Sequence, residues 1–193
     1  MKVIHIRALA AVLAFAAAAA IGQQNGASAR ALPEVFSATA SIDSPNGQAS
    51  VPVVIKIDRF TTDTERDALV AVVKSNDAAK TVKALEQQKD AGTITFGGRV
   101  TPIKYAYARA TGDGRLVTLV TARPVLFVGG GLPDAKPKTG HDLAIALLML
   151  DAKDTGTGEI ALAANVKVTD SGAIQTSDYG RETVRLTKIA RKR

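Results

Sequence analysis

Four aspartates in one stretch of the chain are the side chains best suited to catalysis: Asp142, Asp151, Asp154 and Asp170. When two carboxyl groups converge in one cleft, their surroundings push their pKa values apart, so that one acts as an acid and the other as a base. Other reactive groups are scarce, because the chain contains no cysteine and only two histidines, His5 and His141. The sequence therefore leaves one enzymatic alternative open, a carboxylate-dependent hydrolase in which two of these aspartates converge.

Two of these aspartates begin similar triplets, Asp154-Thr155-Gly156 and Asp170-Ser171-Gly172. Aspartic proteases use such triplets to bring two carboxylates face to face. The triplets lie too close in the sequence for each to occupy its own lobe, so a protease would need a homodimer that pairs two copies of Asp170. Such a triplet between strand-like runs is also typical of a hairpin turn, and we favour that interpretation.

The first 29 residues have the three-part pattern of a secretory signal peptide. Two basic residues precede the apolar run Ala8–Ile21, and Ala27-Ser28-Ala29 forms a small-x-small cleavage site. The run is shorter than the roughly 20 residues that span a bilayer, so we expect cleavage and no membrane-spanning segment afterwards. The mature chain would then act in the periplasm or outside the cell.

Metal and cofactor chemistry has few candidate ligands in this chain. His141 is the only histidine that remains after removal of the leader, so a zinc site built on several histidines cannot form within one chain. The stretch Asp151–Glu159 departs from a calcium loop, because Lys153 and Thr155 stand where oxygen ligands are required and a turn is the better interpretation. We expect no metal, no cofactor and, without cysteine, no disulfide.

Positive charge gathers at the C-terminal end of the chain. After the leader, 23 basic residues stand against 18 acidic ones, and five of the basic residues lie in the last nine positions: Arg185, Lys188, Arg191, Lys192 and Arg193. We expect a single domain over residues 30–189 and a basic tail over 190–193. This tail could attach the protein to an anionic envelope surface, although a solvated terminus is the favoured interpretation. No aromatic residues interleave with the basic ones, so we expect no nucleic-acid partner.

Hydrophobic periodicity predicts a β-rich fold with one helical insertion. The runs Val35–Ile42 and Ser50–Phe60 alternate and flank the turn Ser44–Gly47, which predicts a hairpin. Thr62 and Glu65 form a capping box that predicts a helix, and Asp77 can cap a second helix, for which Gly92 is the predicted stop signal. A two-helix insertion therefore follows the second strand.

The rest of the chain returns to strand patterns. In Arg99–Ala110, which is predicted as one strand, Ile103, Tyr105 and Tyr107 alternate. Further strand-like runs follow: 116–121, 125–128, 143–150, 159–168, 173–175 and 183–189. Short turns between about nine strands predict an α+β fold whose mainly antiparallel sheet is barrel-like or two-layered.

Four residues are candidates for a ligand site: Tyr105, Tyr107, Arg123 and His141. Tyrosines on one sheet face, with Phe127, can line a small-molecule cavity, although core packing is the favoured interpretation. An arginine in such a cavity would bind an anion. His141 follows a glycine-rich loop and could act as a base or pH sensor, or be a solvated loop residue.

Short segments of the chain are similar to those of a loose group of exported bacterial proteins without an assigned function: Gly98-Arg99-Val100, Tyr105-Ala106, Thr121-Ala122-Arg123-Pro124 and Val184-Arg185-Leu186. The resemblance covers roughly residues 36–189 and implies no activity, cofactor or catalytic residue. The leading hypothesis is a non-catalytic envelope or secreted protein that binds a ligand or a partner. The alternatives are the hydrolase and attachment through the basic tail.

Overall fold

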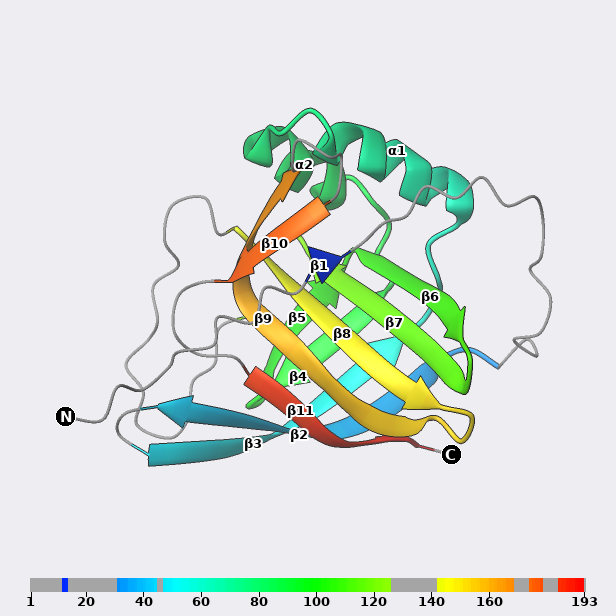
Figure 1. Ribbon diagram of the computed structural model, residues 1–193, viewed down its shortest axis with the longest axis vertical. Helices are drawn as coiled ribbons and strands as arrows, with labels where there is room; N and C mark the ends of the chain where they lie inside the picture. Colours follow the sequence, from blue (N-terminus) through cyan, green and yellow to red (C-terminus); the bar gives the residue numbers. More distant parts are fainter. Residues whose placement is uncertain are drawn as a thin grey trace.

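Antiparallel strands and two helices make up the protein in a computed structural model (Figure 1). The structure describes residues 12–13, 31–44, 47–125, 142–168, 174–178 and 184–192. In these residues the elements are β1 (Val12–Leu13), β2 (Glu34–Ser44), β3 (Gly47–Ile57), α1 (Asp63–Val73), α2 (Ala78–Glu86), β4 (Gly92–Phe96), β5 (Arg99–Ile103), β6 (Tyr105–Thr111), β7 (Gly114–Thr121), β8 (Leu143–Asp151), β9 (Thr155–Val168), β10 (Ile174–Asp178) and β11 (Val184–Arg191).

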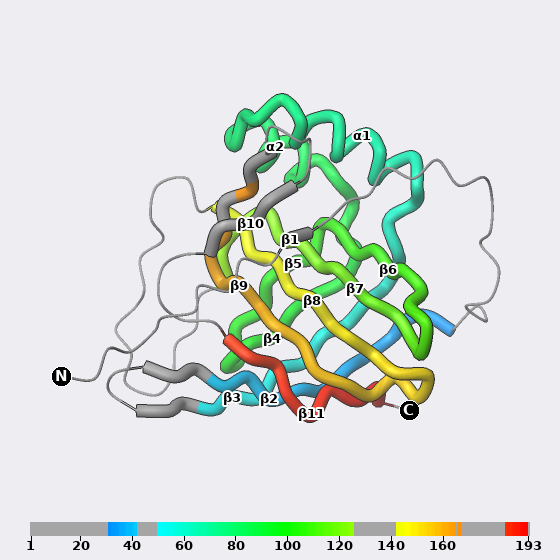
Figure 2. Tube along the Cα trace, viewed as in Figure 1, coloured from blue at the N-terminus to red at the C-terminus, as the bar shows by residue number. Residues whose placement is uncertain are grey.

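Nine strands form a strongly curled sheet in the order β5-β4-β3-β2-β11-β9-β8-β7-β6. The strands at the two ends of this order, β5 and β6, are separated in sequence by Lys104 alone, so the ends of the sheet must meet there. The Lys104 amide donates a hydrogen bond of 2.8 Å to the Val120 carbonyl of β7. Figure 2 shows the resulting, nearly barrel-shaped trace. The predicted α+β fold, with an antiparallel barrel-like sheet and two helices after the β2–β3 hairpin, is confirmed.

Two strands lie off this path. β10 pairs with the second half of β9, and β1, which falls within the predicted leader, pairs with β10. The strand predicted over residues 125–128 begins at a residue outside any strand, and residues 126–128 lie outside the described residues.

Alternate residues of the strands turn apolar side chains into the interior of the curled sheet. Phe36, Phe96, Leu119 and Leu148 come from four different strands and are almost completely buried. Burial of each such side chain stabilises the fold by about 1.5–3 kcal/mol, so this interior is the main source of stability.

The helices begin where capping residues predict them. Thr62 accepts a hydrogen bond from the Glu65 amide, and the Glu65 carboxylate accepts one from the Thr62 amide at 2.8 Å. Asp77 accepts from the Lys80 amide at 3.0 Å and caps α2. The role expected for Gly92 was wrong, because α2 ends at Glu86 and Gly92 begins β4.

Close contact between two strands explains Gly92. A Cβ atom at this position would lie 1.9 Å from the Lys56 carbonyl oxygen of β3, and the backbone has a φ of +154°. Only glycine allows β4 to approach β3 this closely.

The capping box of α1 predicts a specific pH dependence. A hydrogen bond from Arg59 is the main cause that lowers the pKa of Glu65 from 4.5 to about 2. Charged Glu65 therefore stabilises the fold above pH 4.5, and this contribution is lost as the pH falls towards 2. In urea unfolding, Glu65→Gln, which can still cap, is expected to be less stable than the wild type at pH 7 and to approach it near pH 2. A gap of equal size at both pH values would contradict this.

The strand expected over Arg99–Ala110 is in fact two strands on opposite ends of the sheet. Ile103 of β5 faces the interior, whereas Tyr105 packs outside and Ala106 faces the interior. The corner at Lys104 thus shifts the alternation by one residue. Sequence alternation alone could not reveal the corner, because one residue is enough to make it.

The two helices pack on the outer face of the sheet. Leu69 of α1 and Leu85 of α2 cover Tyr105, Leu143 and Ile145 in a second apolar cluster. Figure 1 shows both helices near one end of the sheet. Neither helix of the described residues is long and apolar enough to cross a membrane.

Candidate functional site

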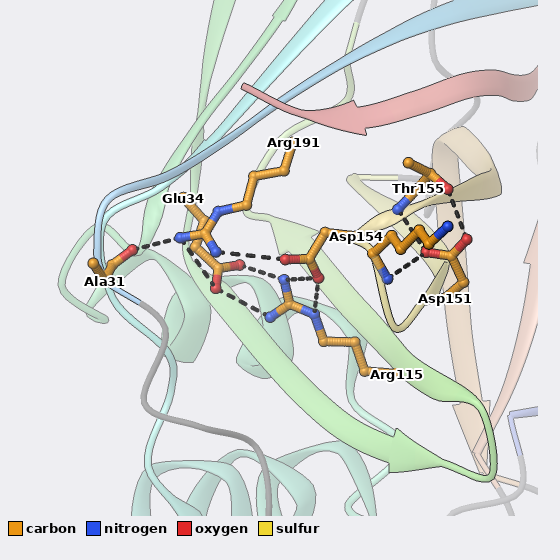
Figure 3. A network of polar contacts seen from close by, with 8 residues as sticks. Ala31, Glu34, Arg115, Asp151, Asp154, Thr155 and Arg191 are labelled. Carbon is orange, nitrogen blue, oxygen red and sulfur yellow. Dashed lines mark hydrogen bonds and ion pairs between the residues drawn. The ribbon is translucent and has the colours of Figure 1, made fainter. Parts of the chain in front are cut away.

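Three charged side chains form a buried ion network, which is drawn in Figure 3. The Arg115 guanidinium binds Glu34 through two hydrogen bonds, from Nη1 to Oε1 at 3.2 Å and from Nη2 to Oε2 at 2.8 Å. The same guanidinium binds Oδ1 of Asp154 from Nε at 3.2 Å and from Nη2 at 2.9 Å. Glu34 is 0% exposed, and Arg115 and Asp154 are each 6% exposed, so these are among the most deeply buried charges of the described residues.

Arg191 closes the network on its outer side. Its Nη1 lies 3.4 Å from Oδ2 of Asp154, and its Nη2 lies 3.9 Å from Oε1 of Glu34. Its Nη2 also donates a hydrogen bond of 2.7 Å to the Ala31 carbonyl. Two carboxylates and two guanidinium groups therefore balance in charge, and all four carboxylate oxygens have a cationic partner.

Strand ends position these four residues. Glu34 and Arg115 occupy the inward positions of β2 and β7 that precede the interior residues Phe36 and Val117. Asp154 lies in the β8–β9 turn with a φ of 59°, a conformation that aspartate tolerates better than most residues. The network therefore lies at the end of the interior where β2 and β7 begin.

Arg191 was expected in a basic tail, but it belongs to the last strand. β11 runs to Arg191, two residues beyond the domain limit predicted from the sequence, and the Lys192 amide donates to the Val35 carbonyl at 2.7 Å. The side chains of Arg185, Lys188 and Lys192 are exposed. Attachment to an anionic surface stays a prediction. Among the described residues at this end of the chain, these three are the exposed cations that could make such a contact.

The arrangement of the network favours a structural role over acid–base catalysis. A general acid or base must exchange a proton with a substrate within hydrogen-bond reach. The carboxylates of Glu34 and Asp154 are instead occupied by guanidinium donors and screened from solvent. Breaking such a pair is costly, because it leaves a buried charge without compensation.

Of the three described aspartates proposed for a hydrolase, Asp142 lies apart from Asp151 and Asp154, which share the β8–β9 turn, where the Asp154 amide donates to the Asp151 carbonyl at 3.1 Å. Asp142 and Asp151 flank the two ends of β8, nine positions apart, which corresponds to about 30 Å along an extended strand. Asp151 accepts hydrogen bonds from the Thr155 hydroxyl at 2.7 Å and from two amides. The turn is shorter than the predicted stretch Asp151–Glu159, because β9 begins at Thr155. The bond from Thr155 lowers the pKa of Asp151. Asp170 lies outside the described residues, and the hydrolase hypothesis stays a prediction.

Of the four candidate ligand residues, the structure brings Tyr105 and Tyr107 together. Their ring centroids are 6.2 Å apart and the planes are inclined by 24°. Both rings contribute to the cluster beneath the helices, as the core-packing interpretation expects. Arg123 is exposed, and His141 and Phe127 lie outside the described residues.

The two tyrosine hydroxyls differ in their surroundings. The Tyr107 hydroxyl contacts Arg66 and donates to Oδ1 of Asp63 at 3.0 Å, and the Arg66 guanidinium lies 4.9 Å from the ring centroid. The buried Tyr105 hydroxyl has no hydrogen-bond partner among the described residues. Burial raises the pKa of both tyrosines.

This difference predicts opposite effects of two matched substitutions. Tyr107→Phe removes a hydroxyl that joins α1 to β6, and we expect it to lower the free energy of unfolding by about 1 kcal/mol. Tyr105→Phe removes a buried hydroxyl without a described partner, so we expect a neutral or slightly stabilising effect. Urea unfolding of both variants tests this. A larger loss for Tyr105→Phe would show that its hydroxyl is bound.

A shallow groove lies between α2 and the sheet. It is lined by residues that include Ala78, Thr81, Asp142 and Leu143, and its empty space, open solvent included, is about 220 Å³. Small-molecule sites usually measure about 300–1,000 Å³, so this groove is too small for such a ligand. Tyr105 and Tyr107 do not line it.

Sequence reasoning missed Glu34, Arg115 and Arg191 as parts of a site. For Glu34 and Arg115 the sequence did contain a signal. Each is a charged residue at an inward-facing position of a strand whose next inward-facing residues are apolar. Asp154 was noticed as a candidate hydrolase carboxylate and for its triplet, but not as part of a buried ion network. Nothing local connected the four residues.

Among the described residues, no group of three or more acidic, histidine or cysteine side chains could hold a metal ion. Comparisons of the chain with protein-family models, curated proteins and solved structures found no match. The function must therefore be argued from the geometry and from the sequence.

Proposed function

We propose that the protein is a non-catalytic binding domain that acts outside the bacterial cytoplasm and recognises a protein partner from its surface. The supporting observation is the filled interior. Phe36, Phe96 and Leu148 are almost completely buried inside the curled sheet, where a small ligand would otherwise bind. The ion network of Glu34 and Arg115 closes one end of this interior.

Two further features support binding over catalysis. The described carboxylates with the deepest burial, those of Glu34 and Asp154, are held by arginines and serve the fold. Met149 is 53% exposed on the outside of the sheet, which leaves apolar surface available to a partner. The proposed location outside the cytoplasm rests on the signal peptide that the sequence predicts over residues 1–29.

Native mass spectrometry of protein recovered from outside the cytoplasm tests this proposal. The expected result is a chain that begins at Arg30 and is bound to polypeptide, without a small molecule of fixed mass. A cytosolic product that retains residues 1–29, or a stoichiometric small ligand, would contradict the proposal. Enzymatic turnover of a substrate by the wild type that is lost in Asp154→Asn would also contradict the proposal.

A further inference from the structure

Beside β10 the sheet has a strand position that β2 does not fill. β10 and β11 follow one another along the same side of β9, and β8 pairs with β9 on its other side. Ile160 of β9 pairs with Val184 of β11, and four residues further Ala164 pairs with Asp178 of β10. β2 runs beside β11 as far as the pair Ile42–Val184 and then continues with β3. The position next to β10 is therefore open to another strand.

A segment of the predicted leader lies in this position. β1 pairs antiparallel with β10, with Val12 opposite Gln175 and Leu13 opposite Ile174. It takes beside β10 the place that β2 takes beside β11 (Figure 1). Residues 12–13 belong to the apolar run of residues 8–21. The segment that pairs with β10 is thus extended and apolar.

The edges of the strand order at β5 and β6 are less suited to an added strand. β5 carries Pro102, which has no N–H to donate. The beginning of the β6 edge is covered by Thr61, whose hydroxyl accepts from the Ala106 amide at 3.0 Å and whose amide donates to the Ala106 carbonyl at 2.7 Å. Of these three edges in the described residues, β10 is the one against which another strand is paired.

Removal of the leader would leave the β10 edge without this partner. The residues of the interior core and of the cluster beneath the helices all lie between Phe36 and Ile189, so neither cluster uses the leader. The packing of the fold therefore does not depend on β1. The backbone N–H and C=O groups of an unpaired edge, in turn, readily form hydrogen bonds with an extended chain.

We propose that the β10 edge is a strand-addition site for an extended apolar segment of a partner protein, and that the leader covers this site until it is cleaved. This inference rests on the proposed function, because it states how the partner is bound. Main-chain hydrogen bonds supply the affinity, and the apolar side chains of the added segment supply the selectivity.

A peptide of residues 8–17, made soluble by added lysines, tests the proposal on the mature chain, residues 30–193. Saturable binding is expected by fluorescence anisotropy. In an added strand only every second N–H faces the edge. N-methylation at residues 11, 13 and 15, or at residues 12, 14 and 16, is therefore expected to weaken binding at least roughly tenfold for one set and little for the other. No binding, or equal effects of the two sets, would overturn strand addition.

A disulfide measures the register, because the chain itself contains no cysteine. Residues directly opposite each other in an antiparallel pair have Cα atoms about 4.5–5.5 Å apart, within reach of a disulfide. The peptide with Leu13→Cys is expected to cross-link to Ile174→Cys under mild oxidation. Asp178→Cys is the matched control and should stay unlinked, because it lies four residues or about 13 Å further along β10. Equal yields in the two variants would contradict the site proposed here, and circular dichroism shows that both are folded.

The outcomes separate this inference from the proposed function. If native mass spectrometry finds a bound polypeptide but the peptide neither binds nor displaces it, strand addition at β10 is overturned and the binding function stands. Displacement of that polypeptide by the peptide supports both. A mature chain recovered without any polypeptide contradicts the proposed function, and with it the partner that this inference requires.

Discussion

Arg115→Met is expected to lower the free energy of unfolding by about 3–5 kcal/mol, one of the largest effects of any single substitution in this protein. The substitution leaves Glu34 and Asp154 without their shared guanidinium in a place where the side chains are almost completely buried. Water cannot compensate these charges without opening the end of the sheet. Urea unfolding followed by circular dichroism measures the loss.

Two other arginines serve as controls for this prediction. Arg99→Met changes an exposed arginine and is expected to stay within about 0.5 kcal/mol of the wild type. Arg191→Met is expected to have an intermediate effect, because the Arg191 side chain is 24% exposed and solvent can reach its place. If Arg115→Met were as stable as Arg99→Met, the network would have no role in the fold.

Gly114→Ala is the second substitution with a large expected effect, a loss of about 2–4 kcal/mol. Gly114 begins β7 and pairs with Asp151 of β8. A Cβ atom there would lie 1.9 Å from the Leu150 carbonyl oxygen, which is backbone and cannot turn aside. The strands must separate at the point where Arg115 enters the network, so packing and ion pairing are both disturbed.

Gly112→Ala is the matched control in the same hairpin. A Cβ atom at Gly112 would meet nothing within 4 Å, and its φ is not in the left-handed region. We therefore expect a change within about 0.5 kcal/mol. Equal losses in both variants would mean that the turn, and not the contact with Leu150, governs the effect.

Local patterns were sufficient for most of the secondary structure. The capping residues Thr62 and Asp77 predicted both helix starts, since a cap acts within one turn of the chain. The β2–β3 hairpin followed from alternation around a turn. The predictions failed at Gly92 and Lys104, where the backbone conformation depends on a neighbouring strand.

The candidate site was less accessible to prediction. Glu34, Arg115, Asp154 and Arg191 come from four distant parts of the chain, and only the strand order brings their ends together. A charged residue in an inward position signals a buried ion pair but does not identify its partner.

By itself, the sequence determined the β-rich class, the capped helices and the scarcity of catalytic groups, because these depend on residue type and on short-range periodicity. Tertiary structure alone decided that the sheet curls back on itself at Lys104. It also decided that Arg115 joins two carboxylates and that β10 forms an edge beside which β1 lies. Strand register produces these contacts, and register depends on how distant strands pack against one another.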